Sequence, residues 1–329
     1  MNTRETVRQL LSFQPVPSLP IIEWATWWKD STARWLDEGM PPYENNVELM
    51  RYFGLDLLVQ EWFYPRNGRC PRPAAHGVGI VRDEQHYAEL IAQRALYDES
   101  ILAVPNFTRY KSEIDAGNAA HWFTLEGFFW FPRTLLGIER HLLAFYDEPA
   151  FIHRINRDLV DFYKKLLPWL FDQFQPDFMT FAEDMSYNHG SMISEPQFDE
   201  FMLPYYRELV DYIKQRGTKV LIDSDGDVSE CLPWFERAGI EGVLPLERQA
   251  GVDVAAIRQR HPSLLMVGAF NKMVMHRGEK AIREEFERLL PVARQGGFII
   301  SVDHQTPPAV SLDDYRLYLR LFREYAQHL

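Results

Sequence analysis

The second half of the chain alternates two residue patterns, and this alternation constrains the fold more than any other feature. Amphipathic stretches, with apolar residues at i, i+3 and i+4, alternate with short apolar runs that end in a polar or acidic residue. The apolar runs are continuous, which is typical of strands buried on both faces. This order predicts a parallel sheet covered by helices. The candidate strands are 177–183, 219–223, 242–247, 264–268 and 297–303, and the candidate helices are 196–216, 229–238, 253–259 and 279–295.

Two architectures contain such a sheet, a doubly wound sheet and a (β/α)8 barrel. No GxGxxG or Walker sequence occurs, so the phosphate-binding turn of a Rossmann sheet is missing. The 329 residues suit a barrel with insertions, and the N-terminal half supplies further candidate strands at 18–23, 55–61 and 127–131. We therefore expect an α/β fold, a single (β/α)8 TIM barrel with N-terminal additions that forms one domain over residues 1–329.

The charge balance limits the class of partner. The chain has 35 Lys and Arg against 47 Asp and Glu, a formal net charge of −12. Nucleic acid and anionic membrane surfaces are thus disfavoured, and a small-molecule substrate is favoured. We expect no signal peptide, because the first residues lack an apolar core, and no membrane span. The two cysteines, Cys70 and Cys231, have no CxxC partner, which excludes a cysteine-built metal site and favours the cytoplasm.

Acidic residues follow most of the candidate strands. In a barrel the carboxyl ends of the strands surround one cavity, so these residues are expected to face each other. Buried carboxylates need compensation from a cation, a shared proton or basic substrate groups. The strand-end residues are Glu61, Glu183 with Asp184, Asp223 with Asp225, Glu247, Asn271 with Lys272, and Asp303 with His304.

Each of these residues also has a purely structural interpretation. The DSDGD sequence that begins at Asp223 could be a turn whose carboxylates cap backbone amides. It is not an EF-hand, because Trp234 occupies the twelfth loop position. Neighbours on a strand point to opposite faces, so only one of Glu183 and Asp184 reaches the cavity; Glu183 is our preferred one. Glu247 could form a simple surface pair with the residue after it.

Aromatic residues are unusually dense in the N-terminal half. Such clusters usually build cores, but tryptophans over a barrel mouth could also stack a flat ring. Arg133, just after the second cluster, could anchor an anion or form a structural salt bridge. The candidate substrate-binding residues are Trp24, Trp28, Trp62, Trp130, Arg133 and Asn271.

Five segments together resemble the uroporphyrinogen decarboxylase superfamily, which also contains methyltransferases that work with corrinoid proteins. The segments are SEPQFDEFMLPYYREL, VLIDSDG, RAGIEGVLPLE, VGAFNK and VDHQTPPAVSLDDY. The resemblance runs from about Leu55 to the C-terminus. It implies a (β/α)8 barrel, often a homodimer, with a deep cleft at the C-terminal face.

The two branches of this superfamily imply different chemistry. The decarboxylases use an N-terminal arginine motif, where this chain reads IIEWATWWKD; Glu61 would replace their aspartate, and His304 matches their histidine. The methyltransferases place a His-x-Cys pair where Asp223 and Asp225 stand here, and a cysteine where His304 stands. Those ligands hold zinc. Carboxylate and imidazole ligands also suit zinc, and they admit harder divalent ions.

The resemblance and the residues together predict a metal-dependent methyltransferase. It would move a methyl group between a small oxygen-bearing substrate, such as an aryl methyl ether, and a corrinoid carried by a partner protein. The expected ligands of the metal, Zn²⁺ or another divalent ion, are Glu183, Asp223, Asp225 and His304, and the expected proton-transfer residues are Glu61, Glu247 and Asp184. The alternatives are a metal-free decarboxylase that acts on a porphyrinogen-like or other carboxylate substrate with Glu61 and His304, and a binding subunit without catalysis.

Overall fold

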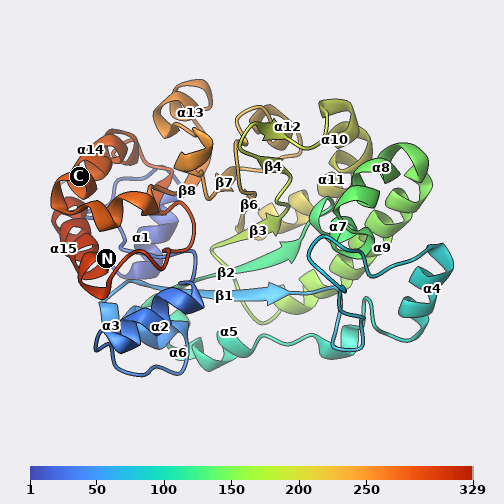
Figure 1. Cartoon of the computed structure of the whole chain (residues 1–329), viewed down its shortest axis with the longest axis horizontal. Helices are drawn as coiled ribbons and strands as arrows, with labels where there is room; N and C mark the ends of the chain where they lie inside the picture. Colours follow the sequence, from blue (N-terminus) through green and yellow to red (C-terminus); the bar gives the residue numbers. More distant parts are fainter. Residues whose placement is uncertain (328–329) are drawn as a thin grey trace.

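A computed structural model describes residues 1–327 of the chain, and it shows an α/β fold built on one curled parallel sheet (Figure 1). The sheet has seven strands in the order β1-β2-β3-β6-β7-β8-β9, and every neighbouring pair is parallel. Helices cover its outer surface: α14 and α15 lie on one side in Figure 1, and α8, α9 and α11 lie on the other.

The strands are β1 (Leu57–Phe63), β2 (Ala119–Glu126), β3 (Phe178–Ala182), β4 (Ser186–Tyr187), β5 (Gly190–Ser191), β6 (Lys219–Asp223), β7 (Gly242–Leu244), β8 (Leu265–Phe270) and β9 (Phe298–Val302). The α-helices are α1 (Thr3–Leu10), α2 (Lys29–Asp37), α3 (Asn46–Phe53), α4 (Glu84–Ala92), α5 (Pro105–Arg109), α6 (Lys111–Asp115), α7 (Trp130–Leu136), α8 (Ile138–Asp147), α9 (Pro149–Phe171), α10 (Glu195–Phe201), α11 (Leu203–Lys214), α12 (Leu232–Arg237), α13 (Val254–Arg260), α14 (Glu279–Ala293) and α15 (Leu312–Ala326). The 3₁₀ helices are η1 (Glu99–Ile101), η2 (Arg248–Ala250) and η3 (Lys272–Arg277).

The continuous apolar runs form strands buried on both faces, as the sequence predicts. Every residue of β2, β3, β8 and β9 is buried. β6 has the predicted bounds, and β7 covers only the first half of its predicted run. None of the helices in residues 1–327 is long and apolar enough to cross a membrane.

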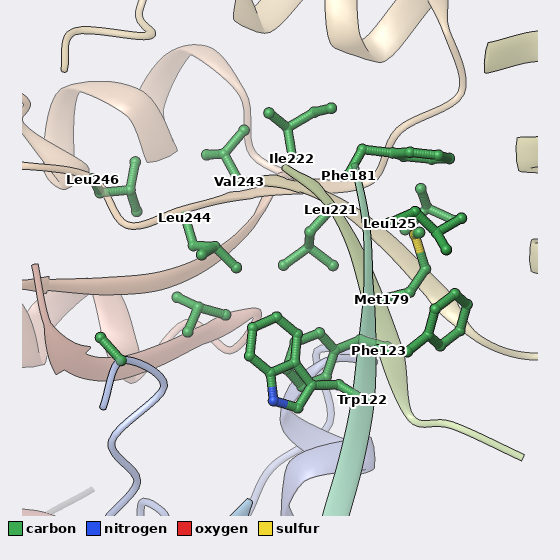
Figure 2. Close-up of a cluster of buried hydrophobic side chains, with 14 of the residues drawn as sticks. Trp122, Phe123, Leu125, Met179, Phe181, Leu221, Ile222, Val243, Leu244 and Leu246 are labelled. Atoms are coloured by element: carbon green, nitrogen blue, oxygen red, sulfur yellow. The ribbon is translucent and has the colours of Figure 1, made fainter. Parts of the chain in front are cut away.

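The concave side of the sheet is filled by large apolar side chains. Figure 2 shows Trp122 of β2, Leu221 of β6 and Leu244 of β7 on one side of the strands, whereas Phe123 and Met179 lie on the other side, which α9 covers. The five side chains are at most 1% exposed. The apolar side chains on the concave side fill the inside of the curled sheet, and the cavity of the candidate site lies toward the carboxyl ends of the strands.

The predicted strand at 127–131 is wrong. β2 ends one residue earlier, at Glu126, and the chain turns at Gly127 into helix α7. Gly127 donates its backbone N–H to Ala182 O at 2.8 Å, and a Cβ at this position would overlap the Glu183 carboxylate. The apolar run FFWF therefore belongs to a tight turn and a buried helix, which periodicity alone does not distinguish from a buried strand.

The predicted strand at 18–23 is also absent, although the segment lies where an eighth strand would close the barrel. Its Ile21 exchanges two hydrogen bonds with Asp56, just before β1, at 2.8 and 2.9 Å. On the other side, Glu23 and the backbone N–H of Trp24 bond to the Ser301 hydroxyl of β9. Pro20 lacks an N–H donor and interrupts a regular ladder. We call residues 19–24 the closing segment, because side chains rather than strand pairing join it to both edges of the sheet.

Candidate active site

A cavity of about 250 Å³ opens at the carboxyl ends of the strands. It is lined by residues in or just after β1, β3, β6 and β9, by the first residue of α7, and by residues 24–26 at and after the end of the closing segment. Carboxyl ends of parallel strands are the face at which barrel enzymes carry their active sites. The lining residues are Trp24, Ala25, Thr26, Gln60, Trp62, Trp130, Ala182, Asp184, Asp223, Asp225, His304 and Gln305.

Strand alternation decides which residue of β1 reaches the cavity. Gln60 and Trp62 line it, and Glu61 between them points to the opposite face. The Glu61 carboxylate accepts the backbone N–H groups of Asn106 and Phe107 at the start of α5. Burial raises the pKa of Glu61 to about 7, against the lowering effect of these hydrogen bonds. The structure therefore corrects the predicted placement of Glu61 in the cavity.

The same alternation separates Glu183 from Asp184 after β3. Glu183 is fully buried outside the cavity, where it accepts the backbone N–H groups of Phe128, Phe129 and Trp130 and the hydroxyl of Tyr206. Burial raises the pKa of Glu183 to about 7. It is thus an anchor for the start of α7, and Asp184 takes the cavity position that we expected for Glu183.

Asp184 lies in the cavity wall with a strained backbone conformation, and an ion pair holds its side chain. Its φ of 42° lies in the left-handed region, which L-residues adopt at a cost and which is enriched at functional sites. The Arg133 guanidinium donates to the Asp184 carboxylate at 2.7 Å and to its carbonyl oxygen at 3.0 Å. Burial raises the pKa of Asp184, and Arg133 opposes this rise.

Asp223, Asp225 and His304 meet in the cavity. The His304 Nε2 lies 3.5 Å from the Asp225 Oδ2, and this partner raises the pKa of His304. Asp223 differs from both: within residues 1–327 its carboxylate has neither a hydrogen-bond donor nor an ion-pair partner. Burial, with the neighbouring charges of Asp225 and Asp184, raises the pKa of Asp223 well above its ordinary value.

A second polar cluster lies near the strand ends but outside the cavity lining. The buried Asp303 accepts the backbone N–H groups of Arg248 and Lys272, each at 3.1 Å. Glu247 accepts the Gly226 N–H at 3.0 Å and lies 3.6 Å from the Lys272 ammonium. The cluster joins the loops after β6, β7, β8 and β9. Glu247, expected to transfer protons, is therefore tied to neighbouring loops.

Asn271 and Trp28 also lie outside the cavity. The Asn271 side chain caps η3 by accepting the Met273 N–H at 3.0 Å, and it accepts a second hydrogen bond from Gln249. Trp28 is 47% exposed on the surface. The structure therefore does not place either residue where we predicted it, in contact with a substrate in this cavity.

Three of the predicted tryptophans do line the cavity, and each is fixed in place. The Trp24 Nε1 donates to Val302 O at 2.7 Å. Trp62 stacks on Tyr64 with ring centroids 5.7 Å apart. The Arg133 guanidinium lies 4.4 Å from the Trp130 ring, a cation–π contact. Arg133 therefore orients one wall of the cavity and pairs with Asp184.

Three of the four expected metal ligands, Asp223, Asp225 and His304, line the cavity, but they do not form a metal-binding group with Glu183. Glu183 lies outside the cavity with its oxygens occupied by four donors, and His304 is paired with Asp225. In the part of the chain that the structure describes, no group of three or more His, Cys, Asp or Glu side chains is placed to hold a metal ion. A resident zinc ion does not fit this arrangement of donors.

The sequence reasoning missed five polar or small residues of the lining, Ala25, Thr26, Gln60, Ala182 and Gln305. Gln60 could have been predicted from its position next to Glu61, because neighbours on a strand point to opposite faces and only one of the two reaches the cavity. Thr26 follows the closing segment, whose irregular backbone has no periodic signal.

Comparisons with known proteins agree with the resemblance seen in the sequence. Residues 133–325 match the family model described as uroporphyrinogen decarboxylase (URO-D). A search of curated proteins finds no match. A methyltransferase from Methanosarcina mazei superposes with a TM-score of 0.64 at 11% identity, over 99% of each chain. A putative vitamin-B12 independent methionine synthase from Listeria monocytogenes gives a TM-score of 0.51 at 13% identity, over 96% of this chain and 99% of that one.

At these identities the two solved structures show that the fold is shared. The family model covers more than half of the chain, including the strand ends that carry Asp184, Asp223, Asp225 and His304. The chain belongs to the uroporphyrinogen decarboxylase (URO-D) family.

Proposed function

We propose that the protein is a methyltransferase that removes a methyl group from the oxygen of a small substrate, an aryl methyl ether, and passes it to a corrinoid carried by a partner protein. One observation carries the proposal: three fixed tryptophans and a half-buried carboxylate without a hydrogen-bond partner among the described residues, Asp223, share one small cavity. The methyltransferase from Methanosarcina mazei with the same fold supports the reaction class.

The tryptophan walls favour a flat aromatic substrate. Trp24, Trp62 and Trp130 are each held by a hydrogen bond, a stacked ring or a guanidinium, so they need little reorganisation to receive a ring. Aromatic rings pack favourably against each other in offset-stacked or edge-to-face arrangements. A cavity of about 250 Å³ suits a single ring with small substituents.

Asp223 is the proposed proton donor. Because its raised pKa keeps a proton on the carboxyl group above the usual range of an aspartate, it can act as a general acid. When the methyl group departs, the substrate oxygen gains negative charge, and the proton of Asp223 passes to that oxygen. In this proposal Asp223 has the role that we had expected for Glu61 or Glu247.

The His304–Asp225 pair is the proposed electrostatic support. Asp225 raises the pKa of His304 and so favours the imidazolium form. A positive charge next to the substrate oxygen stabilises the developing oxyanion. The corrinoid would supply the methyl-accepting centre, and no step in this cavity is assigned to a metal ion.

The decarboxylase alternative lacks its pair of residues. It needs Glu61 and His304 in one cavity, but only His304 lines the cavity, and Glu61 caps α5 on the other face of β1. We therefore do not propose this reaction.

Transfer of a methyl group from 2-methoxyphenol to chemically reduced free cobalamin tests the proposal, with methylcobalamin measured by absorbance. We expect turnover by the wild type and a loss of about a hundredfold or more in Asp223→Asn, the usual weight of a general acid. Asp227→Asn is the matched control, because Asp227 lies in the same loop and caps the Ser229 N–H outside the cavity lining. Equal rates in the two variants, or no transfer by the wild type, would overturn the proposal.

A further inference from the structure

A second cavity adjoins the first across Trp130. It has a volume of about 730 Å³ and lies between the loop 66–80 and helix α7. Trp130 lines both cavities, and Arg133, which lines the second, forms the ion pair with Asp184 of the first. The two cavities therefore have Trp130 as a common wall residue, and the Arg133–Asp184 ion pair joins their linings.

The charge of this second cavity is opposite to that of the whole chain. Three arginines and a histidine line it, and its lining contains neither Asp nor Glu. The chain as a whole has a net charge of −12. A basic hollow in an acidic protein concentrates a positive potential where anions are otherwise repelled. The basic lining residues are Arg66, Arg72, His76 and Arg133.

Two of these arginines already have acidic partners, and one does not. Arg66 pairs with the buried Glu126 at 2.9 Å, and Arg133 pairs with Asp184 at 2.7 Å. Within residues 1–327 the Arg72 guanidinium has no hydrogen bond or ion pair. All five of its N–H donors are thus available to a ligand, in the planar arrangement that fits a carboxylate or a phosphate.

The loop that carries Arg72 is held at both ends, so the cavity is already formed. At one end Asn67 donates its N–H to Ala95 O at 3.0 Å. At the other, Ile80 donates to Leu135 O at 2.8 Å, and a Cβ on Gly79 would overlap the backbone of the turn after α7. Prolines on both sides of Arg72 restrict the chain between these anchors.

We propose that the second cavity is a binding site for an anionic group, a carboxylate or a phosphate, of a ligand that reaches the reaction cavity past Trp130. Arg72 provides the free charge-assisted donors, and Arg66 and Arg133, which line the same cavity, add positive charge. The site does not depend on the methyl-transfer reaction, because it rests on the lining and the charge of its own cavity.

Cys70 gives a direct readout, because its half-buried thiol lines this cavity while the other cysteine, Cys231, is fully buried. We propose to measure the rate of Cys70 alkylation by iodoacetamide in the whole protein, with inorganic phosphate or benzoate added. Sodium chloride at the same ionic strength is the reference. We expect phosphate, benzoate or both to slow the alkylation, and the more protective probe identifies the anion class.

Arg72→Gln should raise the half-protective concentration by about tenfold, as expected for the loss of one charge-assisted contact. Arg72→Lys keeps the charge and should keep most of the protection. Arg82→Gln is the matched control, because it removes the same charge from an exposed arginine outside the cavity lining, and it should protect like the wild type. Failure of both anions to protect Cys70, or full protection in Arg72→Gln, would overturn the inference. The assay measures no methyl transfer, so its failure is distinct from failure of the proposed function.

Discussion

Glu183, which is buried, and Asp223, which is half-buried, are carboxylates at the ends of neighbouring strands, and their surroundings give them opposite roles. Glu183 has three backbone N–H groups and a tyrosine hydroxyl as partners. Asp223 has none of these and is next to Asp225. A carboxylate whose hydrogen-bonding capacity is filled holds structure together, whereas one that is left without partners in a cavity is available to a ligand.

Glu183→Ala should destabilise the protein without removing a group that touches substrate. The change leaves three backbone N–H groups and the Tyr206 hydroxyl buried without a partner, which costs roughly 3 kcal/mol or more. Urea unfolding measures the loss, and Glu200→Ala, at an exposed position on α10, is the control. A Glu183→Ala protein as stable as the control would contradict the anchoring role.

Asp223→Asn should stabilise the protein at neutral and alkaline pH. Because the folded-state pKa of Asp223 is raised, the wild type loses stability as the pH rises above about 3.9, the unfolded value, and through the folded value. The neutral amide escapes this loss, so the variant should gain about 1 kcal/mol or more at pH 8, since one pKa unit corresponds to about 1.4 kcal/mol. Unfolding free energies at pH 3.5 and pH 8 check it; a variant that is less stable at pH 8 would contradict the assignment.

At the scale of elements, the closing segment occupies the place of an eighth strand, and side-chain hydrogen bonds join it to the sheet. Glu23 accepts hydrogen bonds from Ser301 of β9 at 2.9 Å and from the Tyr315 hydroxyl of α15 at 3.0 Å. Burial raises the pKa of Glu23 to about 7. The segment also carries Trp24 to the cavity wall, so the closure and the site share one support.

Glu23→Ala should loosen this side of the barrel. The Ser301 and Tyr315 hydroxyls and the Val302 N–H lose their acceptor, at a cost of roughly 2 kcal/mol, and the effect should be local. Hydrogen exchange by mass spectrometry should show faster exchange in residues 19–27 and in β9, with β3 unchanged. Uniform protection in both regions would show that the closing segment does not depend on Glu23.

The sequence predicts the regular elements of this fold well and its closure poorly. Continuous apolar runs mark β3, β6, β8 and β9 because burial on both faces requires them. The run at 127–131 is as apolar as a strand, but the N–H contacts to Glu183 make it a turn and a helix. Such long-range contacts leave no periodic trace in the chain.

The sequence predicted which strand ends carry the candidate site. It did not predict correctly which side chains at those ends point into the cavity. Asp223, Asp225 and His304 reach one cavity as expected. Glu61 and Glu183 are one position out of phase with the cavity, and a shift of one residue on a strand reverses the side chain. The sequence alone does not fix that phase, because both faces of these strands are buried.

At the scale of the whole molecule, two cavities of opposite charge share the Trp130 wall. The first has the unpartnered acid, and the second has the unpartnered arginine. Treatment with a chelator tests whether a metal ion takes part. Because the described donors do not assemble into a metal site, we expect methyl transfer to be unchanged after dialysis against EDTA. A loss of activity that added Zn²⁺ restores would contradict this expectation.

The pH profile of methyl transfer from 2-methoxyphenol tests the central claim, that Asp223 reacts as a protonated acid. The rate should be highest at low pH within the stable range and should fall as the pH rises through the raised pKa of Asp223. In Asp223→Asn the part of this fall that comes from Asp223 should disappear, and only the weaker dependence on the His304 imidazolium should remain. A wild-type rate that rises as Asp223 loses its proton, or a fall that persists unchanged in Asp223→Asn, would contradict the account.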